Sequence, residues 1–217
     1  MTGEAIGMNQ KHTINMRRVY LDSAATTPLD PRVREAVEPF WYKEFGNPGG
    51  LYEEGRRAKE AVTNAREYIA RLIGAKADEI IFTSGGTESD NLAIFGAAKA
   101  ALSKMSMSNI GGLTVGSAAE GGARPHIITT QFEHHAVLRP CEQLEKEGFD
   151  VTYLGVGEEG IVNPEDVKKA LRPETALVTI MYANNEIGTI QPIREIGKMI
   201  KEFRDQKKSA SSYPLPP

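Results

Sequence analysis

Short apolar runs alternate along the chain with longer segments in which apolar residues recur every three or four positions. The short runs predict buried strands, and the longer segments predict helices. We expect strands at 19–21, 80–83, 126–130, 151–154 and 176–181. We expect helices from 30 to about 40 and at 54–72, 88–103, 135–147, 163–171 and 192–203. Continuous apolar strands joined by helices predict an α/β fold with a mostly parallel sheet and helices on both faces.

Signals at the helix ends support this organisation. Asp30-Pro31 and Asn163-Pro164 each offer a capping side chain followed by proline at the first helical position. Gly74 and Gly148 are expected to end helices. The other segments are expected to be a flexible leader at 1–16, a flexible insertion at 105–124 and a linker-like tail at 205–217.

Composition excludes several classes of function. The 26 basic and 29 acidic residues give a net charge of −3, so no basic excess favours nucleic acid or an anionic membrane. No apolar run approaches the roughly 18 residues that span a bilayer, and the polar N-terminus shows no secretory signal. Cys141 is the only cysteine, which excludes an intramolecular disulfide and fits a reducing cytosol. We therefore expect a cytoplasmic protein.

A glycine-rich turn joins the predicted strand at 80–83 to the helix that follows it. Gly85, Gly86 and Thr87 stand at the helix N-terminus, where free N–H groups and the helix dipole favour an anion, most often a phosphate. The alternative is an ordinary strand-to-helix turn with a threonine cap. The turn matches neither the P-loop nor the dinucleotide-binding glycine pattern.

Two more polar segments should reach the same edge, because ligands of parallel sheets bind beyond the carboxyl ends of the strands. After the strand at 126–130, His134 or His135 could stack on a flat cofactor, act as an acid or base, or bind a metal. The alternative is a histidine that caps the helix. His12 and His126 suggest no further metal ligands, so we expect no metal site.

The third segment follows the strand at 176–181. Asn184 and Asn185 could hydrogen-bond a ligand hydroxyl or carboxylate, or form a turn that reverses the chain. Together, the three segments would offer an anion cradle, an aromatic plane and an amide at one edge. This combination suits a flat cofactor that carries a phosphate and a hydroxyl.

Five motifs, in order along the chain, resemble those of the cysteine desulfurase family. They are Tyr20-Leu21-Asp22-Ser23-Ala24-Ala25-Thr26-Thr27-Pro28, Phe45-Gly46-Asn47-Pro48, Phe82-Thr83-Ser84-Gly85-Gly86-Thr87-Glu88-Ser89-Asp90-Asn91, Glu133-His134-His135-Ala136-Val137-Leu138 and Asn184-Asn185-Glu186-Ile187-Gly188. The resemblance runs from about Arg18 to about Arg204. It implies a class V, fold-type I enzyme that uses pyridoxal 5′-phosphate (PLP). It also implies that 17–204 form an incomplete large domain, whose helical segment 30–74 packs with the small domain in the full-length family.

The resemblance implies a role for each matching residue. Gly86 and Thr87 would bind the PLP phosphate, and His134 would stack on the pyridine ring and is a candidate acid or base. Asn185 would hydrogen-bond the ring hydroxyl and help to place the substrate, and Asn47 would lie near the substrate carboxylate. In this family, sulfur passes from L-cysteine to an enzyme cysteine as a persulfide, leaving L-alanine. The implied partners are L-cysteine, a sulfur acceptor such as an iron–sulfur scaffold protein, and a second copy in a homodimer.

The chain also departs from the family pattern. Its sequence has no Ser-x-His-Lys motif for the Schiff-base lysine. It also has no match to the aspartate that pairs with the pyridinium nitrogen, or to the loop cysteine that takes the sulfur. Cys141 lies inside a predicted helix, where we expect a small buried apolar residue rather than a nucleophile. We therefore expect the N-terminal part of a desulfurase, inactive alone. The alternatives are a truncated, non-catalytic remnant and another class V enzyme such as a selenocysteine lyase.

Overall fold

The computed structural model describes residues 17–108 and 124–211. The chain divides into two units, residues 1–58 and 59–217, and each is described by itself. The predicted leader at 1–16, most of the predicted insertion and residues 212–217 of the predicted tail lie outside the described residues.

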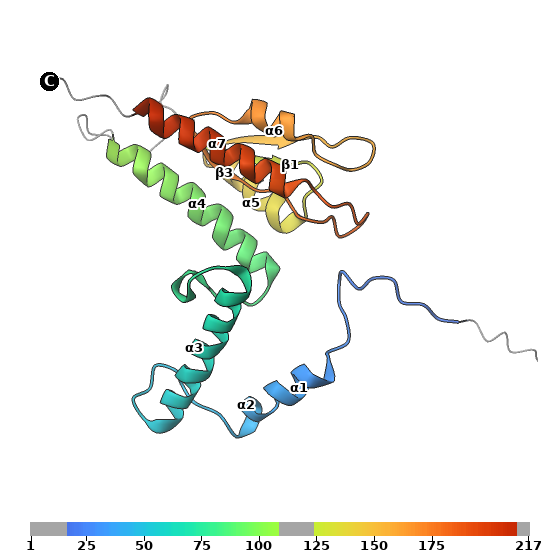
Figure 1. The fold of residues 1–217 in the computed structure, drawn as a ribbon, viewed down its shortest axis with the longest axis vertical. Coiled ribbons are helices and arrows are strands. Elements are labelled where there is room, and N and C mark those ends of the chain that lie inside the picture. The colour runs from blue at the N-terminus through green and yellow to red at the C-terminus, as the bar shows by residue number, and fades with distance from the viewer. Residues whose placement is uncertain (1–16, 109–123, 212–217) are drawn as a thin grey trace, which may run out of the picture. The chain divides into compact units, whose positions relative to one another are not determined.

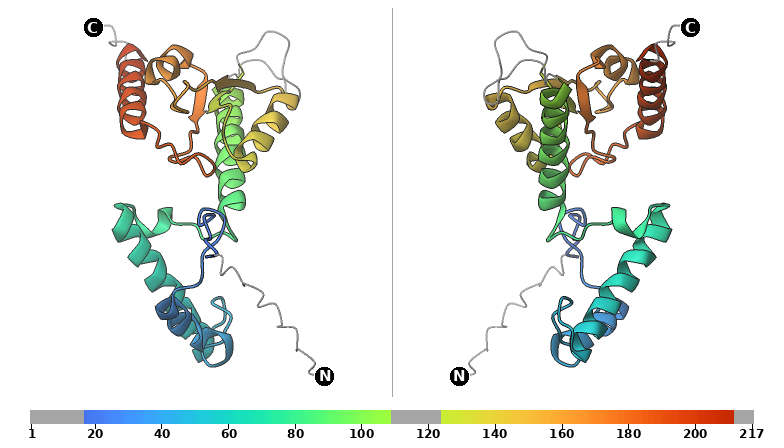
Figure 2. Two further views of the ribbon diagram at one scale, coloured as in Figure 1. Left: turned by 90° about the vertical axis from the view of Figure 1, so that its right-hand side faces the viewer. Right: turned by 90° about the vertical axis from the view of Figure 1, so that its left-hand side faces the viewer.

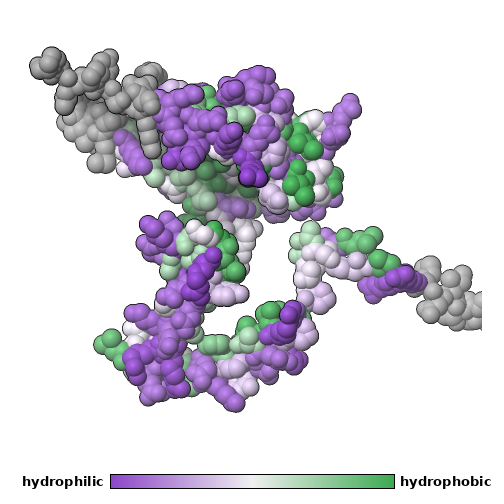
Figure 3. Space-filling model, viewed as in Figure 1, coloured by the Kyte–Doolittle hydropathy of each residue, from purple (hydrophilic) through white to green (hydrophobic). Residues whose placement is uncertain are grey.

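Short helices in the first unit follow signals in the sequence. They are α1 (Pro31–Val37), α2 (Pro39–Tyr42) and the first part of α3 (Glu53–Ile73). The Asp30 carboxylate accepts the Arg32 N–H at 2.8 Å, so the predicted cap of α1 is confirmed. Large apolar side chains of α1 and α2, such as Phe40 and Trp41, are exposed (Figure 3).

The second unit is built on a three-stranded parallel sheet with the strand order β2-β1-β3 (Figure 1). The strands are β1 (His126–Thr130), β2 (Asp150–Leu154) and β3 (Thr175–Val178). The central strand β1 is buried along its whole length, as expected for a strand covered on both faces. A register shift after His126 places Leu177 opposite Ile127, so Ala176 is an extra residue in β3. The predicted parallel sheet is confirmed.

Helices cover both faces of this sheet (Figure 2). They are α4 (Gly86–Ser108), α5 (His135–Lys146), α6 (Pro164–Ala170) and α7 (Ile193–Ser211). Helices α4 and α5 pack on one face, where Ile94, Ile127 and Leu144 are buried together. Helices α6 and α7 pack on the other face around Ile128 and Ile196. Ile127 and Ile128 enter different cores because successive strand residues point to opposite faces.

The helix ends largely follow the predicted signals. The Asn163 side chain accepts the Glu165 N–H at 3.0 Å at the start of α6. Gly74 and Gly148, which follow α3 and α5, have φ values of 68° and 91°, in the left-handed region that glycine adopts without strain. Helix α4 continues to Ser108 and α7 to Ser211, both beyond the predicted ends. None of the described helices combines the length and hydropathy that a bilayer span requires.

The strands predicted at 19–21 and 80–83 are wrong, because neither segment joins the sheet. Ile81 and Phe82 are 68% and 47% exposed, and the Arg66 guanidinium lies 5.0 Å from the centre of the Phe82 ring. An apolar run becomes a strand only when a neighbouring strand supplies its backbone hydrogen bonds. Among the described residues, no strand pairs with either segment.

Candidate functional site

The turn before α4 is held by its own side chains. Ser84 donates its hydroxyl and its N–H to the Glu88 carboxylate, each at 2.6 Å, and these bonds lower the pKa of Glu88. The hydroxyls of Thr83 and Ser89 are 2.6 Å apart. The Ser89 N–H donates to the Gly85 carbonyl at 3.1 Å, which closes the first helical turn. Hydrogen bonds within the turn therefore shape it before any ligand binds.

Three backbone N–H groups at the start of α4 have no acceptor within the helix. Because the Gly85 carbonyl accepts from Ser89, the N–H groups of Gly86, Thr87 and Glu88 precede the first intrahelical donor. A Cβ atom added at Gly85 or Gly86 would meet no atom within 4 Å. The Thr87 side chain is exposed. The start of α4 therefore offers N–H donors, a hydroxyl and a positive dipole end to an anion.

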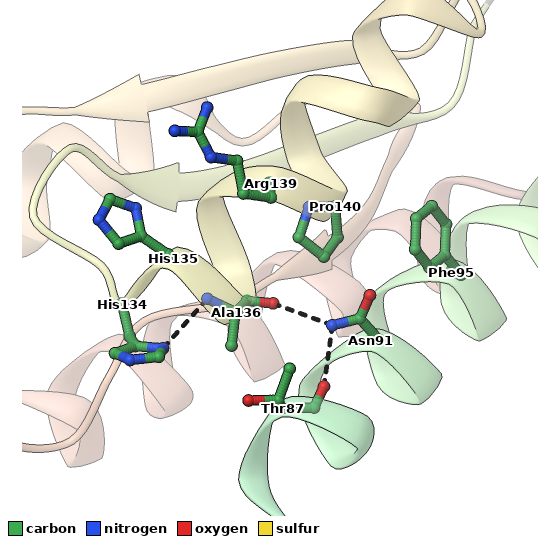
Figure 4. A pocket seen from close by; sticks show the side chains of 8 residues that line it. All are labelled: Thr87, Asn91, Phe95, His134, His135, Ala136, Arg139 and Pro140. Carbon is green, nitrogen blue, oxygen red and sulfur yellow. Dashed lines mark hydrogen bonds between the residues drawn. The ribbon is translucent and has the colours of Figure 1, made fainter. Parts of the chain in front are cut away.

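His134 caps the N-terminus of α5. Its Nδ1 accepts the Ala136 N–H at 3.0 Å (Figure 4). The neutral ring then carries its proton on Nε2, and the residue stays exposed. The capping alternative is thus confirmed, and it holds the imidazole in one orientation while leaving it accessible. Within the described ranges, no group of three or more His, Cys, Asp or Glu residues could hold a metal.

A proline inside α5 leaves one carbonyl available to α4. Pro140 has no N–H, so the Ala136 carbonyl lacks its helical donor. The Asn91 Nδ2 donates to this carbonyl at 3.3 Å and to the Thr87 carbonyl at 2.8 Å. Asn91 therefore connects the N-terminal ends of α4 and α5.

The two helix ends form an open pocket of about 400 Å³. Its lining residues are Thr87, Asn91, Phe95, His134, His135, Ala136, Arg139 and Pro140 (Figure 4). The structure thus brings together Thr87 and His134, and Gly86 directly precedes Thr87. Asn91, Phe95 and Arg139 were given no role from the sequence. Spacings of four residues from Thr87 and from His135 could have placed them on these helix faces.

The loops that follow β1 and β3 are bonded to each other. One oxygen of the Glu133 carboxylate accepts the Met181 N–H at 2.7 Å and the Thr130 hydroxyl at 3.1 Å. The Asn184 Nδ2 donates to the Phe132 carbonyl at 3.2 Å. Glu133 is only 7% exposed, and burial raises its pKa. These bonds fix the backbone beside His134 to the backbone beside Asn185.

The predicted asparagines lie in different environments. Asn184 is buried, and its Oδ1 accepts the N–H groups of Glu186 and Ile187, each at 2.9 Å, so the turn alternative is confirmed for this residue. Asn185 is exposed and does not line the pocket. Asn47 belongs to the first unit, where its Oδ1 accepts the Gly49 N–H at 2.9 Å.

Cys141 is a core residue, as predicted. Its side chain is 0% exposed and packs with the residues under α4 and α5. Burial, followed by the charge of Glu133, raises the pKa of Cys141 to about 11. A thiol of this kind is a poor nucleophile, because the reactive form is the thiolate.

Comparisons with known proteins agree with the predicted family. The aminotransferase class-V family matches residues 19–108 and 113–206. The chain is 54% identical over 187 residues to cysteine desulfurase IscS of Dictyoglomus turgidum. The matched region covers 86% of this chain and 43% of that protein. It is 47% identical over 186 residues to cysteine desulfurase IscS of Methanosarcina thermophila, and the matched region covers 86% of this chain and 41% of that protein.

Solved structures show the same relationship. The structure of SspA in complex with cysteine matches 85% of this chain and 48% of that chain, with a TM-score of 0.73 and 39% identity. A NifS-like protein matches 86% of this chain and 46% of that chain, with a TM-score of 0.74 and 35% identity. The chain spans less than half the length of each of these four proteins. The resemblance to cysteine desulfurases is confirmed, and the chain belongs to the PLP-dependent aminotransferase class-V family.

Proposed function

We propose that the chain is part of a cysteine desulfurase, which takes sulfur from L-cysteine, releases L-alanine and leaves a persulfide on an enzyme cysteine. The persulfide would supply iron–sulfur cluster or thio-cofactor synthesis. The observation that carries the proposal is the pocket shared by Thr87 and His134, beside the open N–H groups at the start of α4. Similarity to named desulfurases, and the cysteine bound to SspA, support the reaction and the substrate.

The residues present fit the phosphate and the ring of PLP. A phosphate needs several donors at one point, and the exposed residues Gly86 and Thr87 offer two N–H groups and a hydroxyl. The exposed imidazole of His134 lies in the same pocket and is large enough to stack on a pyridine ring. When bound, PLP supplies an electron sink for the substrate.

Each site residue has a separate task in this proposal. Gly86 and Thr87 bind the phosphate, and His134 stacks on the ring. Because the Nδ1 of His134 already accepts the Ala136 N–H, its Nε2 is the atom left for hydrogen bonding or proton transfer. Asn185 hydrogen-bonds the ring hydroxyl and helps to place the substrate. The role predicted for Asn47, near the substrate carboxylate, is a separate part of the proposal.

The remaining parts of the proposal concern the whole protein. The proposal includes that no described residue takes the place of the family's lysine, its pyridinium-binding aspartate or its sulfur-accepting cysteine. We propose that the 217-residue chain binds the cofactor without turning over cysteine. The full-length protein would act in the cytoplasm as a homodimer and pass sulfur to an acceptor such as an iron–sulfur scaffold protein.

Pyridoxamine 5′-phosphate tests the site directly, because it is fluorescent and has no aldehyde to form a Schiff base with a lysine. Fluorescence anisotropy with the 217-residue chain should show tighter binding than for pyridoxamine without the phosphate. Thr87→Val should weaken binding about three- to tenfold, the value of one lost hydrogen bond. The exposed Thr63→Val on α3 should leave binding unchanged. Equal affinity for the two ligands would overturn the proposal.

A further inference from the structure

We propose that Asn91 is a positioning residue, which fixes the N–H groups at the start of α4 relative to the His134 ring so that one ligand reaches both. The inference rests on the proposed function, in which these N–H groups bind the cofactor phosphate and the His134 imidazole stacks on the cofactor ring. Asn91 acts on them through two backbone carbonyls.

The two hydrogen bonds of Asn91 serve different purposes. The bond to the Thr87 carbonyl, at 2.8 Å, stays within α4. The bond to the Ala136 carbonyl, at 3.3 Å, crosses to α5, 45 residues further along the chain. A side chain that only stabilised its own helix would need the first bond alone. The second bond sets the position of α5 relative to the start of α4.

Ala136 connects this bond to His134 through the peptide groups on its two sides. Its N–H donates to the His134 Nδ1 at 3.0 Å, while its carbonyl accepts from Asn91. A continuous path of three hydrogen bonds therefore runs from Thr87 through Asn91 and Ala136 to the imidazole (Figure 4). Every member of the path lines the same pocket.

Pro140 makes this path possible. In a regular helix, the N–H of residue 140 would occupy the Ala136 carbonyl, but proline has no N–H and its ring clashes with that carbonyl. Ala136 is only 7% exposed, so its carbonyl gains from a donor within the protein. Asn91 is that donor, and Pro140 and Asn91 therefore act as a pair.

Fixed spacing matters only for a ligand that uses both ends of the site. A ligand gains from a second contact when the protein already holds both contacts at the right separation. Inorganic phosphate needs only the start of α4, whereas pyridoxamine 5′-phosphate also needs the His134 ring. Loss of positioning should therefore weaken the binding of pyridoxamine 5′-phosphate and leave the binding of inorganic phosphate nearly unchanged.

The test compares these two ligands on the 217-residue chain. Asn91→Leu keeps the size of the side chain and removes its donors. It should weaken pyridoxamine 5′-phosphate about three- to tenfold, in fluorescence anisotropy. Binding of inorganic phosphate, followed by the amide NMR shifts of Gly86 and Thr87, should change less than about twofold. The control is Gln143→Leu, which removes an amide that bonds to Glu147 within α5, at 2.9 Å.

Pro140→Ala supplies a second test that leaves Asn91 in place. The new N–H competes for the Ala136 carbonyl, so binding of pyridoxamine 5′-phosphate should weaken although α5 becomes a more regular helix. The double variant should bind no more weakly than Asn91→Leu alone, because both changes act on one carbonyl. Additive effects of the two changes would contradict the pairing of Pro140 with Asn91.

The outcomes separate this inference from the function on which it rests. If the unmodified chain binds pyridoxamine 5′-phosphate no more tightly than inorganic phosphate, the proposed function is overturned. If that preference exists and Asn91→Leu retains it, only the role of Asn91 is overturned. An equal loss of both ligands would show that Asn91 supports the phosphate site alone, and would also overturn the inference.

Discussion

Replacing Glu133 by alanine should destabilise the protein much more than replacing it by glutamine. Alanine removes the oxygen that accepts the Met181 N–H and the Thr130 hydroxyl. An unpaired buried donor costs about 1–3 kcal/mol, so two of them should lower the free energy of unfolding by about 2–6 kcal/mol. Glutamine keeps an oxygen at the same position, and we expect a loss of about 1 kcal/mol or less at neutral pH.

Urea unfolding followed by circular dichroism measures this difference. With a slope of about 2 kcal/mol per molar urea, a loss of about 3 kcal/mol moves the midpoint down by about 1.5 M. The glutamine variant should stay within about 0.5 M of the unmodified protein. Equal damage by both substitutions would show that the charge, and not the two hydrogen bonds, carries the effect.

The pH dependence of the free energy of unfolding gives a second check, in which Glu133→Gln is compared with the unmodified protein. Burial raises the pKa of Glu133, so the folded state binds this proton more tightly than the unfolded state does. The protonated Glu133 carboxyl contributes fully to the free energy of unfolding below the unfolded-state pKa of about 4.3. This contribution is lost as the pH rises through the higher folded-state pKa. Glu133→Gln should therefore gain stability relative to the unmodified protein as the pH rises through that window. A constant difference across it would refute the reasoning.

Three more substitutions test other parts of the second unit. His134→Asn should keep the α5 cap but lose binding of pyridoxamine 5′-phosphate, whereas His134→Ala should lose both and melt earlier through a loss of about 1 kcal/mol. Burial, helped by the charge of Arg172, lowers the pKa of His126, so the free energy of unfolding should fall as the pH drops below about 6.5. His126→Gln should flatten that slope in denaturant titrations. The Cys141 thiol should react with a thiol reagent only when the protein unfolds, and fast reaction of the native protein would contradict its burial.

Features that depend on neighbouring residues in the sequence were predictable. The caps at Asp30 and Asn163 form as expected, and β1 has the predicted bounds. The segment 80–83 was not predictable in the same way. Its apolar residues suit a strand, but a strand also needs a partner, which the local pattern cannot reveal.

In the candidate site, too, some features were predictable from the sequence and others depend on how the helices pack. The rule that ligands bind beyond the carboxyl ends of parallel strands predicted that the glycine turn and His134 or His135 would share one edge. Thr87, His134 and His135 do line one pocket, although 80–83 is not a strand. The bond from Asn91 to Ala136 was not predictable, because it depends on how closely α4 packs against α5. Pro140 gives one signal in the sequence, namely a helix residue that cannot donate to the residue four positions earlier.

The bonds between the loops after β1 and β3 also have a consequence for protein synthesis. Glu133 and Met181 are 48 residues apart in the chain, and Phe132 and Asn184 are 52 apart. A ribosome adding about 5–20 residues per second takes roughly 2–10 seconds to cover that interval. During this time the nascent chain already contains α4, α5 and the His134 loop, but the residues that anchor the loop do not yet exist. The loop that carries His134 is therefore anchored only after β3 has been made and has paired with β1, so a ligand that needs this anchored loop binds after the sheet has formed.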